Sequence, residues 1–332
     1  KRMATWKIVL IVLAVLIVAG VVTGFSVYAA NRQDISDFTY QQKEKTQIFS
    51  SDNQVIAEMA AENRTYVSLD QIPKDLQNGL IATEDSRFYS HHGVDYYGIM
   101  RSLVSNLFSG NSTGQGASTI TQQLARVLFD LDVAEPGFMD SVNRKMKEIS
   151  ISRQLEEKYT KDQILEMYLN EYYFGSASYG VQAAAQTYFG KNVSDLNLAE
   201  SAMLAGLPQA PSAYAPNANF EAAKNRQAQV LARMVKEGYI TQEQADQAAA
   251  TEITIMPWSE EQTNDDIKDG YGAFINAALQ EYAEALAPSV MKQKGVDEEE
   301  AVKQIRENIA NGGYRVYTTI NTGYQDAAIS AM

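Results

Sequence analysis

The fold and the chemistry of this chain are decided first by the stretch Ile81-Ala-Thr-Glu84-Asp85-Ser-Arg-Phe88-Tyr-Ser-His91-His-Gly93. It places two neighbouring acids beside an aromatic ring and a histidine within one short segment. An acidic turn of this kind, taken alone, is more often a helix cap or a surface ion pair. A carboxylate held there could also act as a general base. The catalytic hypothesis therefore depends on the motifs that follow.

The second motif, Gly114-Gln-Gly-Ala-Ser118-Thr119-Ile-Thr-Gln-Gln123-Leu-Ala-Arg126, is typical of a turn that leads into a helix. Ser and Thr at such a position are commonly N-caps. The exposed amides of a helix start also bind phosphate readily. Gln123 and Arg126 would follow on the next turn. The segment lacks the Gly-Lys-Ser/Thr of a Walker loop, so a nucleotide site is not indicated.

The third motif consists of Arg144, Lys145 and Glu148. On a helix these residues are spaced by three and four positions, so they share one face. One interpretation is a surface ion-pair cluster that contributes little to stability. The other is a diphosphate clamp, in which two cations stabilise the charge on a departing phosphate oxygen. Glu148 would then hold the cations in place or hydrogen-bond the leaving group.

Composition excludes several other functions. The formal net charge of −13 argues against the basic surface of a nucleic-acid binder, so no nucleic-acid partner is expected. The chain has no cysteine, and its two histidines are adjacent in sequence. It therefore lacks thiolate metal ligands and the helical histidine pair of a zinc protease. We expect no organic cofactor.

The amino-terminal region predicts a single membrane-spanning helix. Residues 8–28 carry no charge, and a helix of that length would extend roughly 30 Å. Lys1, Arg2 and Lys7 precede the apolar run, which predicts a cytoplasmic amino terminus and an extracellular remainder. A cleaved signal peptide is the alternative. A second apolar segment, residues 94–108, fits either a core helix or a segment that dips into the outer leaflet.

The pattern along the rest of the chain predicts a mainly α protein. Short strands are expected soon after the anchor, and helical periodicity dominates as far as about residue 250. An acidic connector follows, and residues 314–320 alternate like the first strand of a further domain whose body we expect to lie outside this chain. The predicted divisions are a tail at 1–7, the membrane helix at 8–28, a juxtamembrane segment with short strands at 29–70, a catalytic domain at 71–250, and a linker with the start of a truncated domain at 251–332.

Taken in order, the three motifs resemble those of the peptidoglycan glycosyltransferase module, glycosyltransferase family 51, of class A penicillin-binding proteins. The resemblance extends through Lys161–Asn170, Tyr179–Ala184 and Tyr188–Lys191, and covers roughly residues 45–250. The strand at 314–320 is similar to the entry of that family's transpeptidase domain, which is missing here. The resemblance implies a lysozyme-like, mainly α domain with a membrane-dipping lobe.

The resemblance also implies the reaction, which is polymerisation of lipid II into β-1,4-linked glycan with inversion and release of undecaprenyl diphosphate. Glu84 would deprotonate the acceptor hydroxyl, with Asp85 beside it as a substrate-binding residue. Glu148 would support the leaving diphosphate. The other positions that match substrate contacts are Ser118, Thr119, Gln123, Arg126, Arg144 and Lys145.

Partners and location follow from the same resemblance. The expected partners are lipid II, the growing glycan strand, membrane lipid, other cell-wall synthesis or division proteins, and a moenomycin-type inhibitor. Similar enzymes often use Mg or Mn, but the sequence fixes no metal ligands. The expected location is the bacterial cell membrane.

Two departures from the family pattern stand out. Arg126 occupies a position where lysine is usual. A planar guanidinium group, which can donate two parallel hydrogen bonds, therefore replaces a compact ammonium group. Residues 129–143 are longer than usual, which puts the path between the second and third motifs in doubt.

Two other functions are compatible with parts of the sequence. A lytic glycosidase could use the same two acids, but a glycan offers no diphosphate to a cationic clamp. A membrane-tethered scaffold would leave Glu84 and Glu148 unexplained. The preferred hypothesis requires the base and the cationic clamp to face each other across a groove that opens at the lipid surface.

Overall fold

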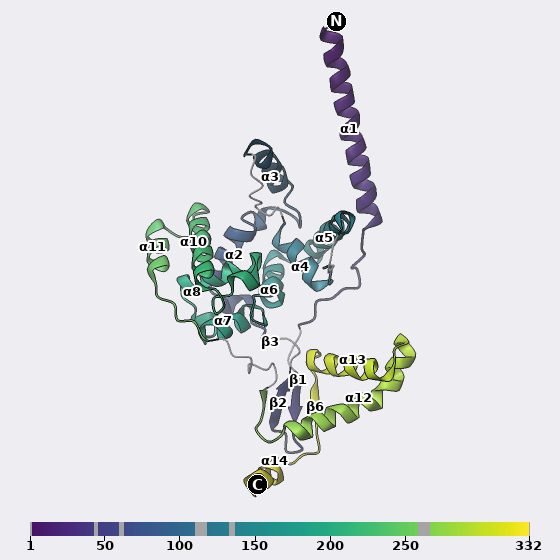
Figure 1. The fold of residues 1–332 in the computed structure, drawn as a ribbon, viewed down its shortest axis with the longest axis vertical. Coiled ribbons are helices and arrows are strands. Elements are labelled where there is room, and N and C mark those ends of the chain that lie inside the picture. Colours follow the sequence, from purple (N-terminus) through teal and green to yellow (C-terminus); the bar gives the residue numbers. More distant parts are fainter. Residues whose placement is uncertain are drawn as a thin grey trace. The chain divides into compact units, whose positions relative to one another are not determined.

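The computed structural model describes residues 2–42, 46–59, 63–109, 118–132, 137–257 and 266–331 (Figure 1). The described chain is mainly helical with a few short strands, as predicted. It divides into two compact units. The first unit comprises Lys1–Thr39 and Leu80–Glu171, and the second comprises Tyr40–Gly79 and Tyr172–Met332. The predicted domain boundaries differ from the limits of these two units, and the predicted domain division stays a prediction.

The first unit is built from helices around the motif segments. Its central pair is α4 packed against α5, and α6 also packs on α4. The spacing of apolar residues explains this packing, because α4 buries Ile120 and Leu124 while α5 buries Ile151 and Leu155. The elements are α1 (Arg2–Ala30), the last turn of α2 (Lys74–Glu84), the 3-10 turn η2 (Phe88–Ser90), α3 (Tyr96–Ser109), α4 (Ile120–Leu128), α5 (Phe138–Lys158) and α6 (Lys161–Glu171).

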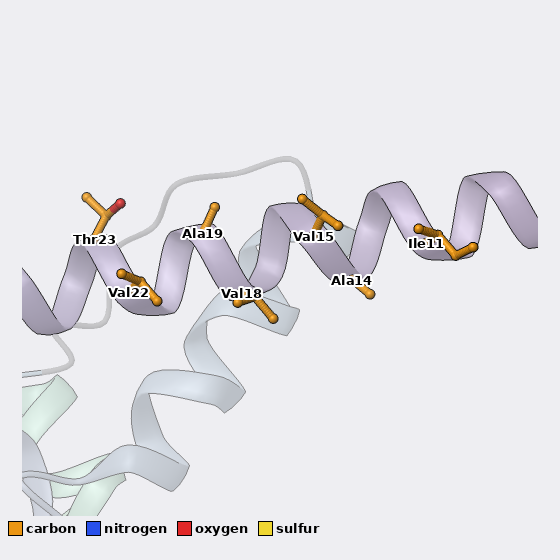
Figure 2. A pocket seen from close by; sticks show the side chains of 7 residues that line it. All are labelled: Ile11, Ala14, Val15, Val18, Ala19, Val22 and Thr23. Carbon is orange, nitrogen blue, oxygen red and sulfur yellow. The ribbon is translucent and has the colours of Figure 1, made fainter.

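Helix α1 contains the apolar run 8–28. In the part of the chain that the structure describes, no helix has both the length and the apolar character required to cross a membrane. The membrane span is therefore not confirmed. One side of α1 carries a shallow apolar strip whose members recur every three or four residues (Figure 2). The strip consists of Ile11, Ala14, Val15, Val18, Ala19, Val22 and Thr23.

The second unit contains a four-stranded sheet in the order β5-β2-β1-β6. Strand β1 (Thr46–Phe49) pairs antiparallel with β2 (Val55–Met59) and parallel with β6 (Arg315–Tyr317), while β5 (Asp266–Ile267) pairs with β2. The segment predicted to begin a separate domain therefore shares a sheet with residues 46–59.

Two helices, α12 (Gly272–Lys294) and α13 (Glu298–Asn311), complete the core of this sheet. Ile48, Ile56 and Ile275 are buried within it.

The remaining helices of the second unit pack on one another, with α10 against both α8 and α11. Strand β3 (Asn63–Arg64) pairs parallel with β4 (Ser178–Tyr179). The helices are α7 (Val181–Phe189), α8 (Leu198–Ala205), α9 (Pro211–Tyr214), α10 (Phe220–Lys236), α11 (Gln242–Ala250) and α14 (Thr322–Ala331), with 3-10 turns η1 (Leu69–Gln71), η3 (Val193–Asp195) and η4 (Leu207–Gln209).

Gly93, at the end of the first motif, allows two segments of the first unit to approach closely. Its φ is +81°, and a Cβ there would lie 2.7 Å from the carbonyl oxygen of Ser152 and 2.9 Å from the amide nitrogen of Arg153. Both contacts are with the backbone of α5, which cannot move aside as a flexible side chain would. The first motif therefore requires glycine here.

We predict that Gly93→Ala lowers the free energy of unfolding by about 2 kcal/mol or more, because backbone strain adds to a steric clash. Gly238→Ala is a matched control, since Gly238 has a φ of +80° but nothing within 4 Å of its added Cβ. The control should cost only about 1 kcal/mol of backbone strain. Urea unfolding followed by circular dichroism would measure both. Equal losses would show that the close approach does not matter.

Candidate active site

The first motif begins within α2, whose last residue is the half-buried Glu84, and continues into a turn held by several hydrogen bonds. Asp85 and His91 are both buried, and the Nε2 atom of His91 lies 3.0 and 2.9 Å from the two Asp85 carboxylate oxygens. The amide of Ile120, the first residue of α4, donates to the same carboxylate at 3.0 Å. A negative charge is favourable at a helix amino terminus. Asp85 thus connects the first motif to the start of the second.

Thr119 acts as the N-cap of α4. Its hydroxyl accepts a hydrogen bond from the Gln122 amide at 3.1 Å and donates to the carbonyl of Gly93 at 2.6 Å. The capping role considered in the sequence analysis is therefore present in the structure. A contact between this buried hydroxyl and substrate stays a prediction.

Glu84 is oriented by the second motif. The side-chain amide of Gln123 donates to Oε2 of Glu84 at 3.0 Å, and the hydroxyl of Tyr168 donates to Oε1 of Gln123 at 2.9 Å. Tyr168 lies on α6 and is fully buried. This chain of hydrogen bonds fixes the direction of the Glu84 carboxylate.

The third motif forms a cationic cluster around a buried carboxylate. Glu148 has no solvent exposure, and three cations surround it. Its Oε1 accepts from Nε of Arg126 at 2.8 Å and from Nη1 of Arg144 at 3.4 Å, while Oε2 accepts from Nζ of Lys145 at 2.9 Å. The cation side chains are 24–35% exposed. Three positive charges and one negative charge leave a net +2 directed partly toward solvent.

Lys145 also binds the second motif. Its ammonium donates to the hydroxyl of Ser118 at 2.7 Å and to Oε1 of Gln122 at 3.1 Å. Burial lowers the pKa of Lys145, and the opposing charge of Glu148 offsets part of this effect. Gln122 was not predicted as part of the site, although its position three residues after Thr119 marks it as a partner in the cap.

Helix α4 contacts both acids. Gln123, which holds Glu84, and Arg126, which holds Glu148, are three positions apart and lie on one helical face. Residues with this spacing have Cβ atoms about 5–6 Å apart. The side chain predicted as base and the predicted clamp are thus held by neighbouring positions of the same helix.

A second buried network supports the first motif. The Lys161 ammonium lies 2.7 Å from Oε1 of Glu156, 3.5 Å from Nδ1 of His91, and 4.3 Å from the ring centre of Phe88. Burial lowers the pKa of Lys161. His91 thus lies between the Asp85 carboxylate at Nε2 and the Lys161 ammonium at Nδ1. Lys161 was quoted in the family resemblance, but this support of His91 was not predicted.

An exposed carboxylate also approaches the clamp. Oδ1 of Asp132, a residue that is 73% exposed, lies 3.6 Å from Nη1 of Arg144 and 3.9 Å from Nε of Arg126. Asp132 belongs to the segment 129–143 that the sequence analysis identified as longer than usual. Part of that segment, residues 133–136, lies outside the described residues.

Metal binding finds no support in the described part of the chain. Within it, no group of three or more Asp, Glu or His side chains could hold a metal ion. The use of Mg or Mn stays a prediction, and the mechanism below includes no step through a metal ion.

Comparisons with known proteins identify the family of this chain. A family model described as Transglycosylase matches residues 52–235, which is more than half of the chain and includes every site residue named above. The chain therefore belongs to the transglycosylase family.

Its relatives include penicillin-binding protein 1A of Escherichia coli (strain K12), 43% identical over 286 residues, or 86% of this chain and 30% of the relative. The chain is 39% identical to penicillin-binding protein 1A of Vibrio cholerae over 335 residues, or 100% of this chain and 36% of the relative. A crystal structure of penicillin-binding protein 1A from Haemophilus influenzae matches at 26% identity with a TM-score of 0.42, covering 89% of this chain and 29% of that one. The chain spans about a third of the length of the curated relatives it matches.

The lowered pKa of Lys145 predicts a pH dependence of anion binding. Lys145 should lose its proton below the ordinary lysine value of 10.5, so the affinity for inorganic diphosphate should fall as the pH rises toward that value. Lys145→Arg keeps the charge and should abolish this decline. Isothermal titration calorimetry at several alkaline pH values would measure it. Identical pH profiles for the wild-type protein and Lys145→Arg would contradict the assignment of Lys145 to the anion-binding clamp.

Asp132 should compete with a bound anion for Arg126 and Arg144. We predict that Asp132→Asn strengthens the binding of inorganic diphosphate by no more than about fivefold, because exposed ion pairs contribute little. Asp130→Asn is the matched control, since it makes the same change in charge in the same turn. Within the described residues, Asp130 forms no ion pair with the clamp. An equal gain in both variants would indicate a general charge effect.

Proposed function

We propose that this chain is a peptidoglycan glycosyltransferase, which polymerises lipid II into β-1,4-linked glycan strands and releases undecaprenyl diphosphate. The observation that supports this best is the placement of Glu84 and the net-positive cluster around Glu148 against one face of α4. An inverting displacement needs a base on the acceptor side and an anion-stabilising group on the donor side, and one helix contacts both here.

On the acceptor side, Glu84 would accept the proton of the sugar 4-hydroxyl as its oxygen attacks the anomeric carbon of the donor. The hydrogen bond from Gln123 holds one carboxylate oxygen, and Tyr168 holds Gln123 in turn. The base is thereby pre-oriented, which reduces the entropy lost on reaching the reactive geometry.

On the donor side, the bond between the anomeric carbon and the diphosphate oxygen breaks, and its electron pair passes to the leaving group. The partly exposed side chains of Arg126, Arg144 and Lys145 would stabilise that charge. Glu148 is fully buried, so its geometry favours the role of holding the cations over direct contact with the leaving group. Attack opposite to the leaving group would convert an α-linked donor into a β-linked product.

The cationic cluster also favours a transferase over the lytic glycosidase. A finished glycan has no diphosphate, so three converging cations would have no partner in its cleavage. A scaffold function would likewise leave the oriented Glu84 without a role.

We propose further that the protein works at the bacterial cell membrane, anchored through residues 8–28 with its amino terminus in the cytoplasm. The uncharged run and its basic flank support this. On α3, the side chains of Tyr96, Tyr97 and Met100 are 60–62% exposed, which supports contact with lipid over burial in a core. Side chains 103–109 of α3 lie outside the described residues. A lysozyme-like fold and the partners expected from the sequence belong to the same proposal.

We predict that Glu84→Gln reduces the polymerisation of lipid II by at least about 100-fold, because the amide cannot accept the proton. The substitution preserves shape, so the thermal unfolding midpoint should change little. Glu157→Gln, an exposed position on α5, is the control and should leave turnover intact. Glycan products would be followed by gel electrophoresis of labelled lipid II.

Two results would overturn the proposal. Substantial glycan synthesis by Glu84→Gln would remove this residue from its role. Degradation of purified peptidoglycan, with lipid II left unchanged by the wild-type protein, would favour the glycosidase.

A further inference from the structure

The chain that follows α1 lies along α5 and forms what we call the strap, residues 31–38. At its start, the side-chain amide of Asn31 donates to Oδ1 of Asn143 at 3.0 Å. In its middle, Nε2 of Gln154 donates to the carbonyl of Gln33 at 2.6 Å, and the amide of Ile35 donates to Oε1 of Gln154 at 3.2 Å. One glutamine side chain thus binds the strap backbone twice.

The far end of the strap is bound in the same way. The ammonium of Lys158 donates to the carbonyls of Ile35 at 3.1 Å and Phe38 at 2.6 Å. The strap ends in a turn, in which the amide of Phe38 donates to the carbonyl of Ile35 at 3.0 Å. Its contacts on α5 extend from Asn143 to Lys158, over which the helix rises roughly 22 Å.

The strap also packs against the end of α4. Ile35 is only 4% exposed and lies in a cluster with Ala125, Leu131, Ile151 and Leu155. The rings of Phe38 and Phe129 are 4.8 Å apart. Ala125 directly precedes Arg126, and Phe129 follows it by one turn. The strap thus contacts both helices that supply the cationic cluster.

The strap and the clamp use different faces of α5. The hydroxyl of Ser150 also donates to the carbonyl of Gln33, at 3.4 Å. At 100° per residue, the strap-binding positions 143, 150, 154 and 158 centre roughly 130° away from Arg144, Lys145 and Glu148. The strap therefore has no direct part in anion binding through α5. Any influence on the clamp must pass through the positions of α4 and α5.

We propose that the strap is a positioning element for the diphosphate clamp, with Ile35 and Gln154 as its positioning residues. The ion pair between Arg126 of α4 and Glu148 of α5 is 2.8 Å long, so a shift of about 1 Å between the helices would break its hydrogen bond. By binding α5 along its length and packing on the end of α4, the strap holds that spacing. This inference rests on the proposed function, because it concerns the same site.

A purely structural role for the strap predicts something different. It would lower the stability of the protein when disturbed, without changing anion affinity in the molecules that stay folded. Affinity for inorganic diphosphate, measured well below the unfolding midpoint, therefore separates positioning from packing.

The test uses Ile35→Ala, which removes most of a buried apolar side chain, and Gln154→Ala, which removes the two side-chain hydrogen bonds to the strap together with two to Ser150. Ile35→Val is the conservative rescue. Ile164→Ala is the matched control, because it removes the same side chain from the buried face of α6, outside the strap's cluster. For the wild-type chain and each variant, diphosphate Kd, kcat and KM with lipid II, and the thermal midpoint would be measured.

We expect Ile35→Ala and Gln154→Ala to raise the diphosphate Kd roughly tenfold, because a misplaced charged group loses much of its effect. The value of kcat/KM for lipid II should fall in parallel, and Ile35→Val should stay close to wild type. Ile164→Ala should lower the thermal midpoint and leave the Kd unchanged.

Unchanged Kd values in both strap variants, or an equal rise in Ile164→Ala, would overturn the positioning role. Should Ile35→Ala fail to fold, Gln154→Ala decides the question alone. A wild-type protein that binds diphosphate, and responds to the strap variants, but does not turn over lipid II would refute the proposed function while the strap's role stands. A wild-type protein that does not bind diphosphate would refute the clamp and, with it, the strap's proposed role.

Discussion

The site depends on one buried carboxylate. Glu148 has no solvent exposure, and a buried charge without partners would cost several kcal/mol. Arg126, Arg144 and Lys145 converge on it for that reason, and they come from two different helices. The ion pairs therefore join α4 to α5 and, at the same time, collect positive charge at a partly exposed surface. The structural support and the proposed anion binding therefore have the same physical origin.

Helix α4 connects the ion pairs of Glu148 to the rest of the site. Its amino terminus rests on Asp85, its first turn orients Glu84 through Gln123, and its last turn reaches Glu148 through Arg126. Because one short rigid helix makes all three contacts, the three motifs cannot move independently. The strap contacts the same two helices, because it packs where α4 and α5 meet.

Much of the site was accessible from sequence because its signals are local. The spacing of Arg144, Lys145 and Glu148 on one helical face and the cap at Thr119 depend on residues within four positions of each other. The contribution of Gln122 and the support of His91 by Lys161 were missed, because both arise from contacts between segments. The pairing of β6 with β1 was missed for the same reason, since more than 250 residues separate the strands.

The sequence by itself determined the mainly helical class, the motif residues and the chemistry they favour, because periodicity, capping and charge spacing act over a few residues. Only the tertiary structure decided that Glu148 is buried, that α4 holds both acids, and that residues 31–38 lie along α5. Burial and long-range pairing depend on which surfaces exclude water together, and no short window of sequence contains that information.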